Sequence, residues 1–384
     1  MRGTNLEKTV RTLGLIFLMF LLAGTVAFAL QEEDMPDEDT GQDVGATQGE
    51  EKISTLSDYL YKKDLQQYEK IKAVADGQAK LDQLTALLKE RPISRILLYA
   101  VTDYMVSANK VAANNQDKLI SLAQALWNLL PTDAQIQAEA KDIPVGLDEF
   151  KRDHLMPARQ LVQRTLAAAY YQKKDFAKAA ECAEKAYAIK ADKDMLQMLF
   201  GLYTQMGNDD KIVAYGEKML QAFPMKQKEG YSTALQLASI YLKKQNIKAA
   251  TQLYSKLMDA YGSSVPPGVE ESNWNPTRAD AYTLMAQEAY TQKNYTKAEQ
   301  FYQKVLTFDS RRENAYYYLG MCRWQLKDQK GAIVYFARCM VLNKSLAPKA
   351  KGYLEQLFKA EYPNGKEEDL NQIIEQAKRD LRLG

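Results

Sequence analysis

Residues 316–336 read YYYLGMCRWQLKDQKGAIVYF, and the order of large and small residues in this stretch decides the fold. Leu319 and Gly320 form an apolar–small pair ahead of a polar turn, and Asp328 is a residue type that starts helices. Ala332 and Phe336 then lie four residues apart, which is about one helical turn. The stretch therefore predicts two consecutive helices joined by a short turn.

The same pattern recurs upstream at intervals. Each copy opens with Asp or Asn, followed by a small residue and usually by an aromatic residue four positions later: DFAKAAECAEKA from Asp175, NIKAATQLYSKL from Asn246, NYTKAEQFYQKV from Asn294 and DQKGAIVYFARC from Asp328. An apolar–small pair precedes each copy: Leu166-Ala167, Leu237-Ala238, Met285-Ala286 and Leu319-Gly320. A weaker copy at 193–226 has Ile212 and Gly216 where Ala and an aromatic residue are expected. Because five copies recur in phase, the chain is predicted to be a repeat array.

These copies resemble the tetratricopeptide repeat, a helix–turn–helix unit of 34 residues, and Ala298 and Ala332 are 34 positions apart. The resemblance implies an all-α solenoid coiled into a right-handed superhelix. No run alternates apolar and polar residues over the length of a strand, so we expect no sheet. We assign the repeats to 158–346, an N-terminal helical region, either degenerate repeats or separate helices, to 56–157, and C-terminal capping helices to 347–384.

The N-terminus is predicted to direct the chain to the cell envelope. Residues 13–30 (LGLIFLMFLLAGTVAFAL) are apolar and uncharged, follow three basic residues and end in a small-x-small sequence that signal peptidases accept. Residues 1–29 are therefore either a cleaved signal peptide, which we favour, or an uncleaved membrane anchor, since 13–30 is just short of a comfortable bilayer span. Either case predicts a periplasmic protein of a bacterial cell envelope, free or attached to the membrane through 13–30.

The segment at 30–55 is predicted to be a disordered linker. Residues 31–51 contain nine carboxylates and no basic residue, with little that could be buried. The segment is either a spacer between membrane and folded part, which we favour, or an acidic interaction tail.

The composition argues against catalysis and against nucleic acid as a partner. The formal net charge is only +2, with no basic excess for a polyanion. His154 is the only histidine, and no second ligand type lies near it at metal spacing. The sequence also has no Gly-rich phosphate loop. We therefore predict no enzyme, no catalytic residues, no metal and no cofactor.

The three cysteines are predicted to be free thiols that serve as small packing residues. Cys322 lies six residues before the turn at Asp328 and Cys339 eleven after it, so on antiparallel helices the two are offset along the axis by ~7 Å as well as separated by ~9 Å between axes. That distance is too long for a disulfide, and Cys182 belongs to a distant repeat.

Residues 260–277 interrupt the array with turn-forming residues and carry Trp274. A loop of this length inside a compact array is often functional, which makes Trp274 a candidate binding residue. The alternative is that Trp274 folds back onto the array.

The family resemblance also implies a partner-binding surface, because in such proteins the first helices of successive repeats line a concave groove for extended peptides or a helix. The corresponding positions here are Arg164, Tyr171, Gln287, Tyr290, Tyr317, Met321, Trp324 and Gln325. The alternative for each residue is packing between repeats. We expect an exported scaffold or adaptor that binds a protein or peptide partner. The alternative is a periplasmic or outer-membrane-associated protein whose aromatic groove binds a ligand such as a glycan.

Overall fold

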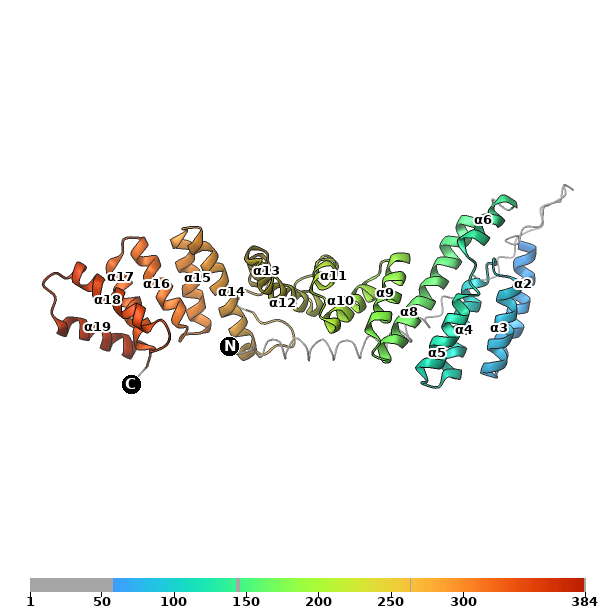
Figure 1. The fold of residues 1–384 in the computed structure, drawn as a ribbon, viewed down its shortest axis with the longest axis horizontal. Helices are drawn as coiled ribbons and strands as arrows, with labels where there is room; N and C mark the ends of the chain where they lie inside the picture. Colours follow the sequence, from blue (N-terminus) through green and yellow to red (C-terminus); the bar gives the residue numbers. More distant parts are fainter. Residues whose placement is uncertain (1–57, 143–145, 263, 383–384) are drawn as a thin grey trace. The chain divides into compact units, whose positions relative to one another are not determined.

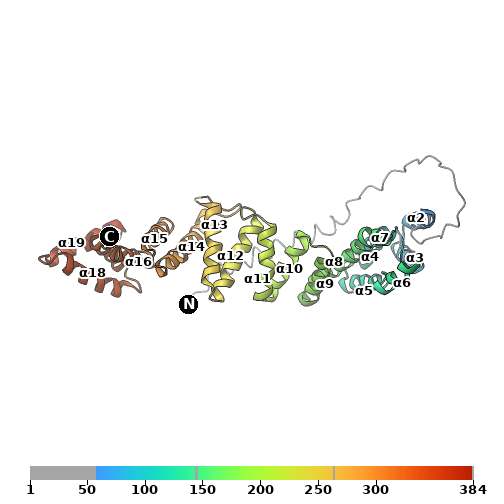
Figure 2. The same ribbon diagram turned by 90° about the horizontal axis from the view of Figure 1, so that it is seen from above.

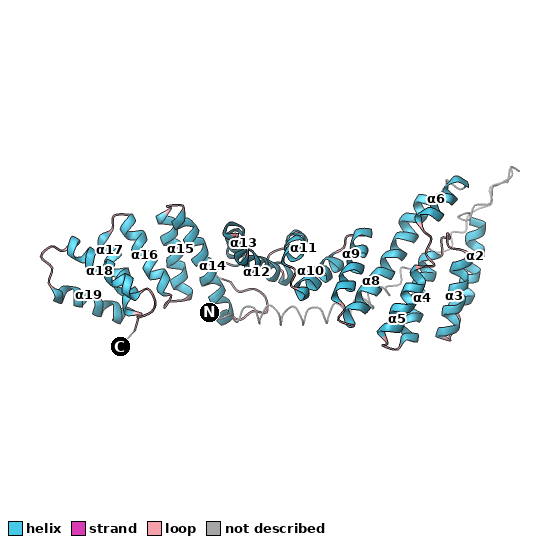
Figure 3. Cartoon of the chain, viewed as in Figure 1, coloured by secondary structure: helices cyan, strands magenta, loops and turns pink. Residues whose placement is uncertain are grey.

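The computed structural model describes residues 58–142, 146–262 and 264–382 (Figure 1). Every regular element in these ranges is a helix and none is a strand, which confirms the predicted all-α fold (Figure 3). Among the described residues, no helix combines the length and the apolar character needed to cross a bilayer. The predicted signal peptide at 1–29, the apolar run at 13–30 and the linker at 30–55 lie outside the described residues, so they stay predictions.

The helices fall into two compact units that divide between Tyr215 and Gly216. The first unit contains α2 (Asp58–Lys72), α3 (Gly77–Glu90), α4 (Leu97–Ala112), α5 (Gln116–Trp127), α6 (Asp133–Asp142), α7 (Leu147–Phe150), the π-helix η1 (Lys151–Leu155), α8 (Met156–Gln172), α9 (Phe176–Ile189), α10 (Lys193–Met206) and the first half of α11 (Asp209–Ala222), whose second half belongs to the second unit. The second contains α12 (Lys228–Lys243), α13 (Ile247–Tyr261), α14 (Glu271–Thr291), α15 (Tyr295–Phe308), α16 (Glu313–Gln325), α17 (Gln329–Val341), α18 (Ala347–Glu361) and α19 (Glu367–Asp380).

The predicted helix starts are confirmed in all four clear copies. The side chains of Asp175, Asn246, Asn294 and Asp328 each accept a hydrogen bond from the backbone N–H three residues later. Such an N-cap stabilises a helix by about 1 kcal/mol, because it satisfies a donor that the helix leaves unpaired.

The turns before these caps share one backbone conformation. The residue just ahead of each cap has a positive φ between 59° and 66°: Lys174, Gln245, Lys293 and Lys327. The weaker copy keeps the same turn, since Gly207 has φ 65° and Asn208 accepts from the backbone N–H of Lys211 at 3.1 Å. The weaker copy is therefore in register with the others.

Small residues lie where paired helices cross. A Cβ added to Gly320 of α16 would come within 2.8 Å of the Phe336 ring of α17, so only glycine leaves room for that ring. Gly216 in α11 plays a similar part, because an added Cβ would come 2.7 Å from the side chain of Leu237 in α12. The weaker copy thus has Gly216 where an aromatic residue is expected because α11 lies close to Leu237 of α12 at this position. Figure 2 shows α12 and α13 as neighbouring helices of the next pair.

The structure shows where the chain breaks between helices at two places. The helical spacing from Ile71 to Leu88 suggests one helix, but α2 ends at Lys72 and Asp76 caps a separate α3. The interruption at 260–277 is also shorter than expected, because α14 already begins at Glu271. At the first place apolar spacing continues past the break, which the cap at Asp76 marks. At the second place residues typical of turns, including Pro276, lie inside α14.

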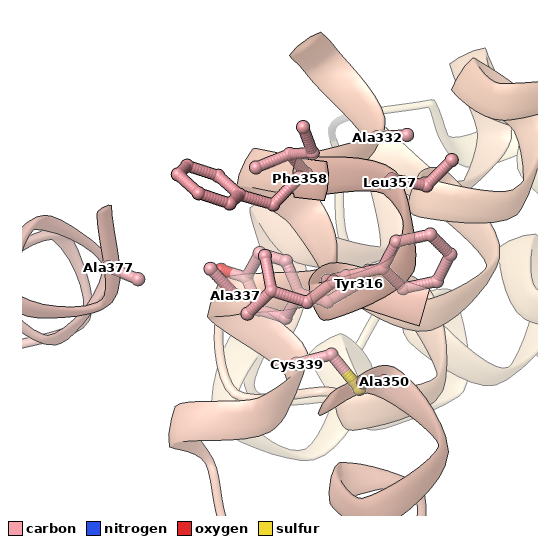
Figure 4. Close-up of a cluster of buried hydrophobic side chains, with 11 residues drawn as sticks. Tyr316, Ala332, Ala337, Cys339, Ala350, Leu357, Phe358 and Ala377 are labelled. Carbon is pink, nitrogen blue, oxygen red and sulfur yellow. The ribbon is translucent and has the colours of Figure 1, made fainter. Parts of the chain in front are cut away.

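The two C-terminal helices expected after the repeats are present as α18 and α19. Four residues of α18 and one of α19 join a buried cluster with α16 and α17: Ala350, Leu354, Leu357, Phe358 and Ala377. Figure 4 shows part of this cluster, with Cys339 of α17 and Ala350 of α18 among its labelled residues. These helices therefore cover the apolar side of the last repeat.

Candidate partner-binding site

The first unit contains a groove of about 700 Å³ between α4, α5, α8 and α10. Its floor is apolar and includes the buried side chains of Met105, Leu119, Met195 and Met198. Amide side chains stand on its walls: Asn109, Asn114, Asn115, Gln116 and Gln172. The groove thus combines an apolar floor with groups that both donate and accept hydrogen bonds.

Arg164 lies on the wall of this groove, as the resemblance implies, but its charge is already paired. Its guanidinium contacts Asp192 at 3.0 Å and Asp194 at 3.2 Å, and Gln160 also donates to Asp192 at 2.9 Å. Asp192 caps α10 by accepting from the backbone N–H of Met195. Arg164 therefore connects α8 to the start of α10. Its side chain forms part of the groove wall, but its positive charge is balanced by the two aspartates.

Tyr171 does not line the groove, although its neighbour Gln172 does. Its half-buried ring lies 5.6 Å from the ring of Phe176 in α9, and burial raises the pKa of its hydroxyl. Tyr171 therefore packs α8 against α9. The resemblance implies that Tyr171 faces the groove, whereas in the structure the next residue, Gln172, lines it.

The second unit carries a continuous aromatic surface, which we define as Tyr290, Tyr317, Tyr318, Trp324 and Tyr353. Ring centroids are 5.4 Å apart between Tyr290 and Tyr318, 5.4 Å between Tyr318 and Tyr317, and 6.2 Å between Tyr317 and Tyr353. Trp324 lies 5.5 Å from Tyr353. The rings are half-buried and come from α14, α16 and α18, the first helices of three consecutive pairs.

The hydroxyl groups of Tyr290 and Tyr317 stay protonated at neutral pH. Burial, together with neighbouring tyrosines, raises the pKa of Tyr317 to about 12, and burial also raises the pKa of Tyr290. The predicted residues Gln287 and Gln325 are exposed, while Met321 is half-buried and packs against the C-terminal cluster. The aromatic surface therefore presents apolar rings and, at Tyr290 and Tyr317, neutral hydroxyls.

Two members of the aromatic surface were missed from the sequence. Tyr318 follows Tyr317, but its ring stacks on Tyr302 of α15 at 5.4 Å, so it connects the surface to the core. Tyr353 lies in the segment assigned to the cap, yet α18 occupies the place of a further first helix. The signal was available, because Tyr353 follows Tyr317 by 36 residues, close to one repeat.

The prediction that Trp274 is a binding residue in a loop is wrong, because Trp274 is buried in a helix. It lies in the first turns of α14, is only 2% exposed, and its ring meets that of Tyr261 edge-on at 5.8 Å. Tyr261 in turn meets Tyr231 of α12 at 6.0 Å. The alternative in which Trp274 folds back onto the array is confirmed.

The cysteines are free and buried, as predicted. Burial raises the pKa of Cys182 to about 11 and those of Cys322 and Cys339 to about 12, so the thiols stay protonated and unreactive in the folded protein. His154 lies in η1 with its ring 6.2 Å from Phe150. In the part of the chain that the structure describes, no group of three or more His, Cys, Asp or Glu side chains could hold a metal ion.

The family model for the tetratricopeptide repeat matches residues 279–311, which span the main part of α14, the turn at Asn294 and all of α15. Residues 279–311 therefore form a tetratricopeptide repeat. The turn conformation and capping of α14–α15 are repeated in the pairs α8–α9, α10–α11, α12–α13 and α16–α17, so the unit that the family model matches is the unit of the array.

Comparison with solved structures gives tetratricopeptide-repeat proteins at low sequence identity. MamA residues 41-end from Desulfovibrio magneticus RS-1 is 17% identical, with 48% of this chain and 95% of that chain covered and a TM-score of 0.30. YrrB, described as a protein with an unusual peptide-binding site, is 15% identical over 54% and 96%, with a TM-score of 0.34. A repeat protein from Parabacteroides merdae ATCC 43184 is 15% identical over 71% and 98%, with a TM-score of 0.28. No curated protein matches the chain in sequence.

Proposed function

We propose that this tetratricopeptide-repeat protein is an exported scaffold that binds extended segments of partner proteins in the groove of its first unit. The observation that carries the proposal is the groove itself, since three of the helices that line it, α4, α8 and α10, are the first helices of the pairs α4–α5, α8–α9 and α10–α11. Binding by such a scaffold needs no catalytic group, cofactor or metal.

The chemistry of the groove favours a peptide with apolar side chains and an unpaired backbone. An extended peptide exposes N–H and C=O groups that need partners, and the wall amides of Asn109 and Gln172 can supply both kinds. The methionines of the floor adapt to side chains of different shape. Because Arg164 is balanced by Asp192 and Asp194, the groove does not demand a strongly charged ligand.

The location in the cell envelope is part of the same proposal. It rests on the basic start of the chain, the apolar run at 13–30 and the acidic segment at 31–51, which together would pass the chain across a membrane and hold the repeats away from it. N-terminal sequencing of the mature protein distinguishes cleavage near Ala29 from an uncleaved anchor.

The test is capture of the partner by crosslinking in cells, followed by affinity purification of the full chain. Ala168→Arg fills the groove from a half-exposed position on α8, and Ala134→Arg places the same side chain at an exposed position of α6 outside the groove. We expect a stoichiometric partner whose recovery falls at least about tenfold in the first variant and is unchanged in the second. Recovery of nothing above background, or equal recovery from both variants, would refute the proposal.

The aromatic surface of the second unit supports one alternative, the binding of a glycan. Its neutral rings and hydroxyls are suited to stacking on sugars and to hydrogen bonding with them. Calorimetric titration with glycans distinguishes the two functions. Binding that is lost in Tyr317→Ala/Trp324→Ala and kept in Ala168→Arg would favour the glycan.

A further inference from the structure

The C-terminal helices of the second unit form a pocket that has no part in the proposed function. The pocket has a volume of about 500 Å³ and lies between the end of α18 and one side of α19. In Figure 1 these two helices are at the end of the unit that lies away from α12. One wall consists of Phe358 and Tyr362, whose ring centroids are 5.2 Å apart. The other wall is a row of five side chains on α19: Asp369, Gln372, Ile373, Gln376 and Arg379.

Helix α19 uses a different side to pack on the array. Ala377 is part of the buried cluster that α16, α17 and α18 form, and Leu370 and Ile374 pack against it. At the end of the helix, Asp380 contacts Arg338 of α17 at 2.6 Å. The four polar residues of the row are exposed, and only its isoleucine is half-buried. Helix α19 is therefore anchored along one side and presents a second, polar side to solvent.

The exposed row on α19 is complementary to itself. Positions 369, 372, 376 and 379 follow the alternating spacing of three and four residues that places side chains along one side of a helix. The row is also balanced about position 374: Asp369 and Arg379 lie five residues to either side, and Gln372 and Gln376 lie two residues to either side. When two such rows meet in opposite directions, each acid faces a base and each amide faces an amide.

We propose that the exposed row of α19 binds α19 of a second copy of this chain, with the two helices antiparallel. Around the twofold axis of such a pair, each residue meets the residue of the other copy that lies equally far beyond the centre. Asp369 then faces Arg379 of the second copy, and this contact occurs twice. Each Gln372 faces Gln376, and both side-chain amides donate and accept hydrogen bonds. The two copies of Ile373 lie beside the centre and add an apolar contact next to the aromatic wall of the pocket.

The charges of the row remain available for a second copy. Arg379 donates from Nη2 to the side-chain oxygen of Gln376 at 2.7 Å, and this amide is neutral. Asp369 accepts from the backbone N–H three residues earlier at 2.9 Å, which is also a neutral group. Glu375 would lie near its own counterpart, but Lys378 of the same helix contacts it at 2.7 Å.

The same charges select the direction of the pair. A parallel pair would place Asp369 beside Asp369 and Arg379 beside Arg379, whereas the antiparallel pair makes both contacts attractive. Charged groups across an interface mainly decide which partner binds and in which register. The antiparallel arrangement is therefore the one that the row favours.

The proposed contact is small, so the dimer should be weak. Helix α19 has 14 residues, which corresponds to about 21 Å of helix. A pair of such helices buries less surface than a stable interface of standard size, so we expect a dissociation constant of about 10–100 µM. The residues of the groove in the first unit take no part in the pairing, so the inference goes beyond the proposed function.

The first test exchanges charges between copies of the full chain in detergent solution. Asp369→Arg leaves two bases in the row and Arg379→Asp leaves two acids, so each variant should self-associate at least about tenfold more weakly than the unchanged chain. An equal mixture of the two variants should associate like the unchanged chain, because every acid again faces a base. Sedimentation velocity between about 5 and 500 µM measures each case.

The mixture and a matched control separate pairing from folding. Asp369→Arg also removes a hydrogen bond at the start of α19, but mixing would not reverse a loss of folding. Glu367→Arg makes the same change of charge in the same turn, at an exposed position outside the pocket. This control should self-associate within about twofold of the unchanged chain.

The second test measures the register of the pair. Copies with Gln372→Cys mixed with copies with Gln376→Cys should form a disulfide in the presence of oxidised glutathione, because the two positions face each other. Two copies with Gln372→Cys should not, since their positions are offset by about 6 Å along the axis in addition to the separation of the helices. The three native thiols are buried and do not compete.

Three results would overturn the proposal. They are an unchanged chain that stays monomeric up to about 500 µM, a mixture that associates no better than its two components, and a disulfide that forms equally in the mixture and in Gln372→Cys alone. If the chain is monomeric and a protein captured from cells is lost in Asp369→Arg but kept in Glu367→Arg, the row binds a different protein and the second copy is excluded.

Discussion

At the scale of the residue, the fold depends on where side chains are missing as much as on where they pack. Gly320 is the clearest case, because the Phe336 ring occupies the space that any Cβ would need. Phe336 is fully buried and its ring also stacks on Tyr353 at 5.3 Å. Because Gly320 carries only a hydrogen atom, α16 and α17 can cross closely. Phe336 can then pack against the ring of Tyr353 in the aromatic surface.

Gly320→Ala is expected to destabilise the protein. An added methyl group would press on the Phe336 ring, which costs about 1–3 kcal/mol by overpacking and outweighs the gain of up to about 1 kcal/mol in helix propensity. Gly352→Ala is the matched control, since its Cβ would meet nothing within 4 Å in α18, and it should stabilise slightly. Urea denaturation measures both, and equal effects of the two substitutions would contradict the steric account.

His154 is expected to make stability depend on pH. Burial lowers its pKa, Asp153 and Glu149 oppose this shift, and Arg95 adds to it. The unfolded chain, with a histidine pKa of about 6.5, therefore binds the proton more readily than the folded chain. The contribution of neutral His154 is fully present above pH 6.5 and is lost as the pH falls through the lower pKa of the folded protein.

The measurement compares the urea midpoint of the unchanged chain and of His154→Gln between pH 7.5 and 5. Other groups that titrate in this range affect both proteins equally, so the difference isolates His154. The unchanged chain should lose more stability than the variant as the pH falls. A larger loss in the variant would show that the pKa shift has the opposite sign.

At the scale of the element, each second helix begins in the same way, and the caps set the register of the array. Asp328 does more than the other caps. It accepts from the backbone N–H of Gly331 at 2.9 Å and from Arg323 at 2.8 Å, and Arg323 also contacts Glu299 of α15. The start of α17 is thereby connected to the end of α16 and to the preceding repeat.

Asp328→Ala and Asp328→Asn separate the cap from the charge. The alanine variant loses the cap and should be less stable by about 1–2 kcal/mol, whereas asparagine is an equally good cap and should retain most of that stability. The hydrogen bond from the backbone N–H of Gly331 lowers the pKa of Asp328. Partial burial opposes this shift, and Arg323 adds to it. Its charge should therefore stabilise the protein above about pH 4, where the unfolded carboxyl ionises, and this contribution is lost as the pH falls.

Thermal or urea unfolding at pH 7 and at pH 3 distinguishes these contributions. The difference between the unchanged chain and Asp328→Asn should be larger at pH 7 than at pH 3. If both variants lose the same stability at pH 7, the ion pair with Arg323 matters more than the cap.

At the scale of the whole molecule, the sequence predicts the repeats better than their surfaces. The helix starts at Asp175, Asn246, Asn294 and Asp328 could be located because local capping chemistry repeats with the helix. The position of Trp274 could not be predicted for two reasons. Its partner Tyr261 comes from the preceding helix, and the turn-forming residues around Trp274 are the same whether the segment is a loose loop or is packed against the array. Arg164 was located on the groove, but its ion pairs depend on a loop about 30 residues away.

The helices α18 and α19 close the C-terminal end of the array. A solenoid buries each repeat only against its neighbours, so the last pair needs a cover. Leu354 and Phe358 of α18 supply it over Phe336, Ala337 and Cys339 of α17. Cys339 therefore reports on the cover, while Cys182 lies in the other unit and serves as an internal reference.

Deletion of 347–384 is expected to expose Cys339 and leave Cys182 protected. Exposure would bring the thiol pKa from about 12 back toward ~8.5, so Cys339 should react with an alkylating reagent at least about a hundredfold faster at pH 8. Leu354→Ala is the milder variant: it should cost about 2–5 kcal/mol and raise the reactivity of Cys339 less. Mass spectrometry of labelled peptides measures each thiol separately. Equal acceleration at Cys182 and Cys339 would mean that the two units unfold together and that α18 and α19 support the whole array rather than its last repeat.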